Sequence, residues 1–283
     1  MPDKRSDDIA PNERASANSA VARRLRQEVH FACPICGNPV LTYHHFDPTW
    51  AERNHNDFTG MIALCQAHHA EAEGGRWSRD ELKEYKTNPP QLAKIAKDFL
   101  WRIGPKLLFR LGGNYATSDR HVIVLNGRPI LSQERSDEGL ALFSLDVFAQ
   151  DDKLLLQVVE NSVSVESLGM WDVQFYGQHN HFIVKPKQGT IALDLHLKRL
   201  SLQDFKAFES QDTGGMSPDQ IDYVVTNCSD GDGNIVFVDI NRAQLYAKGK
   251  LLNVRDGMVI ADIQITGSVV FENSFAAFEF SGL

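Results

Sequence analysis

The feature that most constrains the fold of this chain is a cluster of cysteine and histidine residues between positions 33 and 69. Three of the four cysteines in the 283-residue sequence lie in it. Cys33 and Cys36 are separated by two residues, and the same spacing joins Cys65 to His68. Each pair holds two ligands one short turn apart, as in tetrahedral zinc sites. A segment this short and polar has little core, so we expect a structural zinc ion to supply most of its folding free energy.

The rest of the sequence favours metal over disulfide bonds for these cysteines. The apolar runs are too short to span a bilayer, and the polar first 20 residues lack the apolar stretch of a secretory signal. We therefore expect a cytoplasmic protein without a membrane segment, in which residues 1–20 form a disordered leader. Clustered cysteines in such a protein are typical of a metal site. Cys228 stands alone and is expected to be a partly buried thiol.

Bulk charge does not indicate nucleic-acid binding. The formal net charge is −8, and residues 1–104 hold 14 basic and 14 acidic groups, so the excess of acid lies in residues 105–283. Contact with nucleic acid would have to come from local basic patches on either side of the cysteine cluster. Such clusters can also be solvated helix faces. The candidate nucleic-acid-binding residues are Arg23, Arg24, Arg26, Arg76, Arg79 and Lys83.

Helical patterns surround the cysteine cluster. Residues 17–31 have helix-forming composition, and residues 78–87 begin with Ser78 followed three residues later by Glu81, a capping-box pattern. The Asn-Pro-Pro sequence at 88–90 ends that helix. Apolar residues at helical spacing predict a further helix over 91–103. Gly104-Pro105 then marks a domain boundary, so residues 21–104 form the metal-bearing domain.

Residues 105–283 have the character of an antiparallel β domain. Runs rich in β-branched and aromatic residues alternate with turn sequences, which predicts a sandwich or a curled sheet. The whole chain is therefore expected to be α+β. We expect the second domain to act in regulation, oligomerisation or targeting. Its aromatic and histidine side chains at strand spacing are expected in the core or on a sheet face rather than in a ligand pocket: Trp171, Phe175, Tyr176, His179 and His181.

The two pairs of adjacent histidines predict a second site. If His44 and His45 lie on a strand, their side chains point to opposite faces and have different roles. On a helix that starts near Cys65, His68 and His69 lie about 100° apart. If His68 faces the zinc, His69 faces elsewhere. One histidine of the 44/45 pair and His69 would then form the second site, and the remaining histidine would be free to take a proton.

The motifs CPICG, YHHFDP, NHNDFTG and LCQAHH, which span roughly residues 23–88, resemble the zinc-containing HNH endonucleases. That family has a ββα-metal fold and cuts nucleic acid with one divalent ion. The resemblance implies that His45 is the general base, that His44 and His69 bind the catalytic ion, and that the four zinc ligands are Cys33, Cys36, Cys65 and His68. The sequence GRWS after the last histidine is similar to segments in relatives from bacterial anti-phage systems.

The sequence departs from the family pattern at one position. Gly60 stands where the family usually has an asparagine, five residues before Cys65. Asn54, Asn56 and Asp57 lie nearby, and we expect Asn56 to complete the catalytic site. His55 is interpreted as a loop histidine rather than a ligand.

These observations predict a metal-dependent endonuclease that hydrolyses phosphodiester bonds in DNA, with the β domain controlling a bacterial defence effector. A neutral histidine with a pKa of ~6.5 can deprotonate water. The resemblance implies Mg²⁺ or Mn²⁺ as the catalytic ion, and histidine ligands would also accept Ni²⁺ or Co²⁺. Expected partners are a DNA substrate and either a second copy of the chain or a defence partner protein. The alternative is a catalytically inactive zinc-binding module that contacts nucleic acid or a partner protein.

Overall fold

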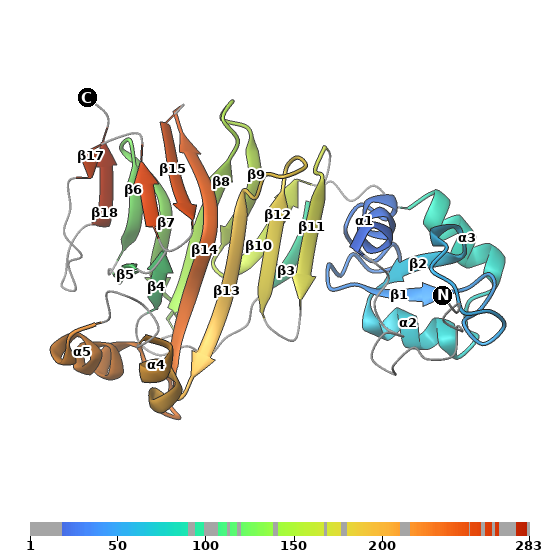
Figure 1. Ribbon diagram of the computed structural model, residues 1–283, viewed down its shortest axis with the longest axis horizontal. Helices are drawn as coiled ribbons and strands as arrows, with labels where there is room; N and C mark the ends of the chain where they lie inside the picture. Colours follow the sequence, from blue (N-terminus) through green and yellow to red (C-terminus); the bar gives the residue numbers. More distant parts are fainter. Residues whose placement is uncertain are drawn as a thin grey trace, which may run out of the picture. The chain divides into compact units, whose positions relative to one another are not determined.

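The protein divides into two compact units, residues 1–93 and 94–283, in a computed structural model (Figure 1). The division comes before the boundary that was expected near residue 104. Helix α1 begins at Ser19, inside the expected leader, and the earlier residues lie outside the described part. The structure describes residues 19–89, 94–98, 107–111, 114–117, 120–137, 141–166, 169–176, 180–209, 216–248, 250–255, 258–261, 264–265 and 276–281.

The first unit consists of a two-stranded antiparallel sheet and helices. Thr42 pairs with Leu64 and His45 with Met61 across that sheet. A short 3-10 turn, η2 (Phe58–Gly60), leads directly into its second strand. The elements in chain order are α1 (Ser19–Glu28), β1 (Thr42–His45), β2 (Met61–Leu64), α2 (Gln66–Glu73) and α3 (Arg79–Thr87).

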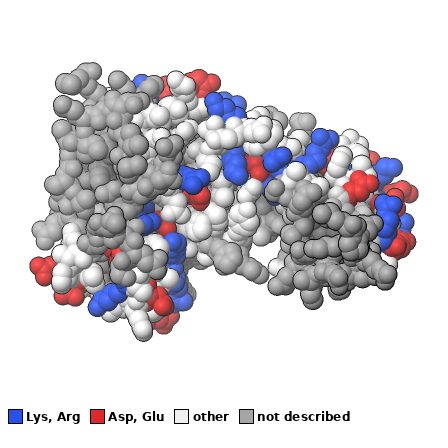
Figure 2. All heavy atoms as spheres, in the orientation of Figure 1, with Lys and Arg blue, Asp and Glu red and all other residues white. Residues whose placement is uncertain are grey.

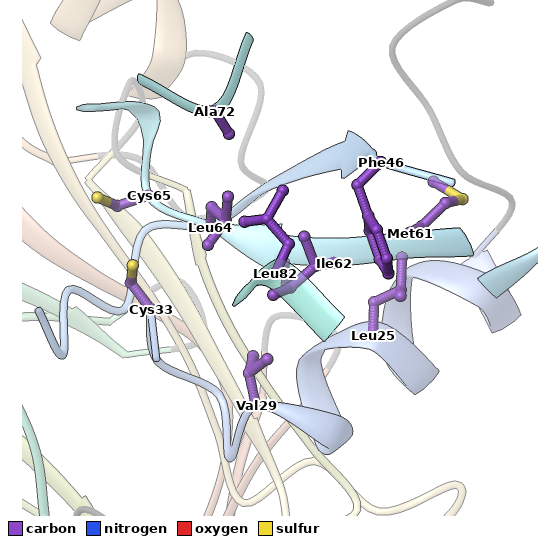
Figure 3. Packing of buried hydrophobic residues seen from close by; sticks show 11 residues of the cluster. Leu25, Val29, Cys33, Phe46, Met61, Ile62, Leu64, Cys65, Ala72 and Leu82 are labelled. Atoms are coloured by element: carbon purple, nitrogen blue, oxygen red, sulfur yellow. The ribbon is translucent and has the colours of Figure 1, made fainter. Parts of the chain in front are cut away.

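A small apolar core holds the first unit together (Figure 3). All four residues of β2 are buried, which fits a strand covered on both faces. Leu25 and Val29 contribute from the α1 side and Leu82 from α3. Cys33 and Cys65 lie together at one edge of the cluster (Figure 3). The apolar core therefore ends where the candidate metal ligands begin.

The predicted capping box at the start of α3 is confirmed. The Ser78 hydroxyl accepts a hydrogen bond from the Glu81 backbone N–H, and the Glu81 carboxylate accepts one from the Ser78 backbone N–H at 2.8 Å. This reciprocal pair satisfies two N–H groups that have no partner within the helix. Leu82 follows directly and is buried, so the cap aligns α3 with the core.

The helix predicted over residues 91–103 is wrong where the structure describes it. Residues Lys94–Asp98 form strand β3, which pairs antiparallel with β10 (Ser162–Glu166). The remaining residues of the predicted helix lie outside the described part. Backbone pairing with a distant strand outweighs local helix preference, because propensity is only a weak prior. This pairing also explains why the second unit begins at Lys94.

Two large sheets, mainly antiparallel, make up the second unit. One sheet has the order β17-β18-β6-β7-β8-β9-β10-β3, and the other has the order β11-β12-β13-β14-β15-β16, with β4 and β5 attached to β14. The first sheet contains, besides β3 and β10, β6 (His121–Leu125), β7 (Arg128–Arg135), β8 (Ala141–Phe148), β9 (Leu154–Val159), β17 (Gln264–Ile265) and β18 (Ala276–Ser281). The second contains β4 (Leu108–Leu111), β5 (Asn114–Ala116), β11 (Asp172–Tyr176), β12 (His181–Lys185), β13 (Leu193–Leu200), β14 (Ile235–Ala247), β15 (Lys250–Arg255) and β16 (Met258–Ala261).

The two sheets pack against each other through β14 and β8, and the rings of Phe109 and Phe143 meet with centroids 6.3 Å apart. Helices α4 (Leu202–Glu209) and α5 (Pro218–Cys228) lie at one end of the β14 sheet (Figure 1). Their cluster includes Phe205 and Phe237, and it buries Cys228 completely. The chain is therefore α+β, as expected. Among the described residues, no helix is both long enough and apolar enough to cross a membrane.

Candidate metal centre and histidine pocket

Four side chains converge at the edge of the first unit's core. Cys33 and Cys36 flank a tight turn in which the Gly37 N–H donates to the Cys33 carbonyl oxygen at 2.7 Å. Gly37 has a φ of +78°, a conformation that favours glycine. Cys65 is the residue just before α2, and His68 lies in its first turn. The turn and the helix together bring the two ligand pairs to one point.

The distances between the four ligand atoms fit a tetrahedral metal site. The Cys36 and Cys65 sulfurs are 3.7 Å apart, and His68 Nδ1 lies 3.5 Å from the Cys33 sulfur and 3.2 Å from that of Cys65. Ligand atoms around a tetrahedral zinc ion would be separated by about 3.8 Å for two sulfurs and about 3.6 Å for sulfur and nitrogen. The cluster can therefore hold a metal ion and is compatible with zinc.

The surroundings of the cluster also suit a cation. Desolvation raises the pKa of the Cys36 thiol to about 12, and the neighbouring sulfurs of Cys33 and Cys65 act in the same direction. A bound cation reverses this effect by stabilising the thiolates. On the far side of the ring, His68 Nε2 lies 4.0 Å from the Glu71 carboxylate. A nearby carboxylate favours a cation at this point.

A second group of possible ligands comes from β1 and α2. His44, His69 and Glu73 each offer one ligand atom, and these atoms lie within 4.8 Å of one another. His44 is buried, and the centroids of the His44 and His69 rings are 5.1 Å apart. Burial, and then the neighbouring His69, lower the pKa of His44 to about 4. Both imidazoles are neutral near pH 7, because burial also lowers the pKa of His69. Neutral imidazole is the form that binds metal.

Thr42 determines which nitrogen of His69 is available. The Thr42 hydroxyl donates its single hydrogen to the Leu64 carbonyl oxygen at 3.1 Å. When it does so, it accepts a hydrogen bond from His69 Nδ1, 2.8 Å away. This leaves the lone pair on Nε2, which lies 3.4 Å from the Glu73 carboxylate. In this arrangement His69 has the tautomer that metal binding through Nε2 requires.

His45 has different partners from His44, as expected for adjacent residues of a strand. His45 Nε2 lies 2.9 Å from the backbone carbonyl oxygen of His55. A carbonyl only accepts, so Nε2 carries the hydrogen and Nδ1 keeps a free lone pair. Burial lowers the pKa of His45, which keeps the ring neutral near pH 7. The Trp50 ring packs beside it at a centroid distance of 4.8 Å.

His55 binds the His45 ring through its backbone carbonyl oxygen, a role that the sequence did not suggest. Its side chain is used within the loop: Nε2 donates to the Pro48 carbonyl oxygen at 2.9 Å, and Nδ1 accepts from the Asp57 N–H at 3.1 Å. The interpretation of His55 as a loop histidine fits these bonds. Asn56, the expected contributor, is exposed and does not line the pocket that contains His44 and His45. A backbone carbonyl leaves no residue-type signal in a sequence.

Gly60 occupies a position with no room for a side chain. A Cβ atom there would lie 1.9 Å from the carbonyl oxygen of Asp47. The Gly60 carbonyl oxygen in turn accepts hydrogen bonds from the backbone N–H groups of Phe46 and Asp47, at 2.9 Å and 3.2 Å. The two backbone segments are therefore in direct contact, and an asparagine would not fit at this position.

The histidines line one surface pocket with a volume of about 440 Å³, which includes His44, His45, Trp50, His69, Glu73 and Arg79. Arg79 contacts the carboxylates of Glu52 at 2.6 Å and Asp47 at 3.1 Å. Three of the other basic residues expected to bind nucleic acid have protein partners: Arg24 pairs with Glu28, Arg76 pairs with Glu71, and Arg26 donates to the Tyr43 hydroxyl. Arg23 is half-buried and Lys83 is exposed.

Basic and acidic side chains are intermixed on the face shown in Figure 2. Of the six candidate nucleic-acid-binding residues, Arg79 is the one brought to the histidine pocket. Comparison of the chain with protein-family models, with curated proteins and with solved structures finds no match.

Proposed function

We propose that this protein is a metal-dependent endonuclease of the HNH type, with a ββα-metal core, that hydrolyses phosphodiester bonds in DNA. One observation carries the proposal. His45 presents a free Nδ1 while its Nε2–H is bound to a backbone carbonyl, and it lies beside a His44/His69/Glu73 group in the same pocket. A proton acceptor next to a potential metal site is what hydrolysis of a phosphodiester requires.

The donor set suits a single divalent ion. His44 and His69 would hold it through nitrogen, and Glu73 is within reach to add a carboxylate oxygen. Such an ion would stabilise the charge that develops on the phosphate and the departing oxygen. Two neutral imidazoles favour Mn²⁺, Ni²⁺ or Co²⁺ alongside Mg²⁺. Thr42 and the fold of α2 hold His69 in position for this task.

His45 would act as the general base. Its Nδ1 would take the proton from a water molecule that attacks phosphorus. As the ring becomes positively charged, the His55 carbonyl oxygen, already 2.9 Å from Nε2, would stabilise it. In this proposal the carbonyl orients the His45 ring. Trp50 packs against the ring and limits its rotation.

The remaining parts of the proposal concern zinc and the second unit. Zinc bound by the Cys33, Cys36, Cys65 and His68 cluster would have a structural role, because four protein ligands leave no open position. The second unit would control the nuclease, through oligomerisation or by docking a partner protein, as in a bacterial defence effector. DNA binding would depend on local contacts such as Arg79 at the pocket, since the second unit is acidic.

The test is single-turnover nicking of supercoiled plasmid by the full chain with Mg²⁺ or Mn²⁺. His45→Ala should still bind divalent ion and DNA while cleavage falls by roughly 10²–10⁴, the usual contribution of a general base. His44→Ala should instead lower divalent-ion affinity, measured by calorimetry, and high Mn²⁺ should restore part of the cutting. His121→Ala, on β6 of the second unit, is the matched control and should cut like the wild type.

Two results would contradict the proposal. If His45→Ala loses metal binding and His44→Ala does not, the two roles are exchanged. If the wild type does not cut, or if both variants cut as fast as it does, the site is not a nuclease centre. The zinc-binding module that contacts nucleic acid or a partner protein would then be the better description.

A further inference from the structure

The second unit carries a histidine and carboxylate cluster on the outer face of the β14 sheet. His181 lies on β12, and Asp194 and His196 lie on β13. His181 pairs directly with His196, and Asp194 is two residues before His196 on the same strand. Side chains of paired residues and of residues two apart share one face of a sheet, so all three point the same way. The alternate leucines of β13 are buried on the opposite face.

The three side chains are close enough to share an ion. One ligand atom from each lies within 4.8 Å of the others. His181 Nε2 is 2.8 Å and His196 Nε2 is 3.8 Å from the same oxygen of Asp194. Nitrogen and oxygen ligands of a tetrahedral zinc ion would be about 3.3 Å apart, which lies between these two values. Small side-chain rotations would bring both pairs to that separation.

The cluster is both sheltered and accessible. The exposed fractions of the three side chains are 16% for His181, 18% for Asp194 and 27% for His196. Partial burial limits competition from water, and the remaining exposure leaves a route for an ion. The Tyr176 ring stacks on His181 at a centroid distance of 5.1 Å, which restrains that ring from its other side.

Charge also favours a cation at this point. The two imidazole rings are only 3.5 Å apart between centroids, which places two nitrogen donors side by side. The Asp194 carboxylate supplies the negative charge. Lys198 acts against cation binding, but its ammonium group contacts Asp239 at 2.7 Å, which offsets its charge.

We propose that His181, Asp194 and His196 bind one divalent transition-metal ion in the second unit, with coordination positions left open for water or another ligand. Two imidazole nitrogens and one carboxylate oxygen suit Zn²⁺, Co²⁺, Ni²⁺ or Fe²⁺ better than Mg²⁺ or Ca²⁺. None of the three ligands belongs to the cysteine cluster or to the His44/His69/Glu73 group. The proposal therefore stands independently of the proposed nuclease activity.

Co²⁺ titration of the full chain, followed by visible spectroscopy and calorimetry, tests the proposal. The titration uses zinc-loaded protein that carries His44→Ala and His69→Ala, so the histidine pocket does not contribute. We expect one Co²⁺ per chain with ligand-field bands and without thiolate-to-cobalt charge-transfer absorption, because the ligands are nitrogen and oxygen. Any Co²⁺ that replaces zinc among the cysteines would reveal itself by that charge-transfer absorption.

In the same His44→Ala and His69→Ala protein, Asp194→Asn and His196→Ala should each weaken this Co²⁺ binding by at least about tenfold. Removing a residue that only hydrogen-bonds to a metal ligand already lowers metal affinity by about that factor. His121→Ala is the matched control and should leave it unchanged. Asp194→Asn keeps the size and shape of the side chain, so it decides the question if His196→Ala does not fold. Absence of the additional Co²⁺, or unchanged binding in folded Asp194→Asn, would overturn the proposal and leave a hydrogen-bonded His–Asp–His group.

Discussion

The family pattern and the structure of this protein predict opposite effects for the replacement of Gly60 with asparagine. The pattern places an asparagine at this position, so a reader of the sequence would expect Gly60→Asn to raise activity. The structure predicts the reverse. A Cβ atom at this position would lie 1.9 Å from the Asp47 carbonyl oxygen and 2.8 Å from its carbonyl carbon. Both are backbone atoms, which cannot rotate away as the end of a side chain can.

The expected loss of stability follows from the displacement of the Asp47 backbone that a side chain at position 60 would require. Overpacking of a tight site costs about 1–3 kcal/mol. The shift would also strain the hydrogen bonds from Phe46 and Asp47 to the Gly60 carbonyl, each worth about 1 kcal/mol. The expected loss is therefore about 2–4 kcal/mol in the free energy of unfolding of the first unit. Phe46 follows His45 directly, so the disturbance would also reach the proposed general base.

Gly74→Ala is the matched control. Its Cβ would meet its nearest neighbour, the Ala70 carbonyl oxygen, at 3.4 Å, and its φ of −72° suits alanine. This variant should be as stable as the wild type or about 0.4–1 kcal/mol more stable. The assay is urea unfolding followed by release of zinc to a chromophoric indicator, which reports on the first unit alone, beside plasmid nicking. A Gly60→Asn variant that releases zinc at the wild-type urea concentration and cuts faster would refute the reasoning.

Three further predictions concern the first unit. Cys36→Ser should remove zinc and unfold the first unit while the β-sheet circular dichroism of the second remains, because the two have separate cores; zinc retained by this variant would contradict the ligand assignment. Thr42→Val should keep the fold but weaken divalent-ion binding by about 10–100-fold in calorimetry, because His69 loses the partner that sets its tautomer. Leu25→Ala should lower the free energy of unfolding by about 2–5 kcal/mol in urea, because Leu25 is fully buried in a small core.

Short motifs with a fixed local geometry were predictable from the sequence. The Cys-x-x-Cys and Cys-x-x-His spacings anticipated a cluster that can hold a metal ion, because two residues of separation close a turn whatever surrounds them. The Ser78 and Glu81 pair anticipated the start of α3 for the same reason. The α+β class also followed, since strand composition and turn sequences recur throughout the second unit.

Long-range pairing was not predictable. Residues 94–98 carry a helical pattern but form β3, because β10 offers backbone hydrogen bonds from a distant part of the chain. The same limit applies to His181 and His196. The position of His181 in the sequence suggested the core or a sheet face, and only the register of β12 against β13 brings it together with His196 and Asp194.

By itself, the sequence determined which candidate metal ligands are present in this protein and which of them are neighbours along the chain. It also determined where the helices α1 and α3 form, because caps and spacings act over a few residues. The tertiary structure alone decided that the His55 carbonyl binds His45, that the Thr42 hydroxyl binds His69 Nδ1, and that no side chain fits at Gly60. In each of those contacts, at least one partner is a backbone or hydroxyl group, and the two residues are ten or more positions apart in the chain. Their chemistry is available at many positions, so only the folded geometry selects which groups meet.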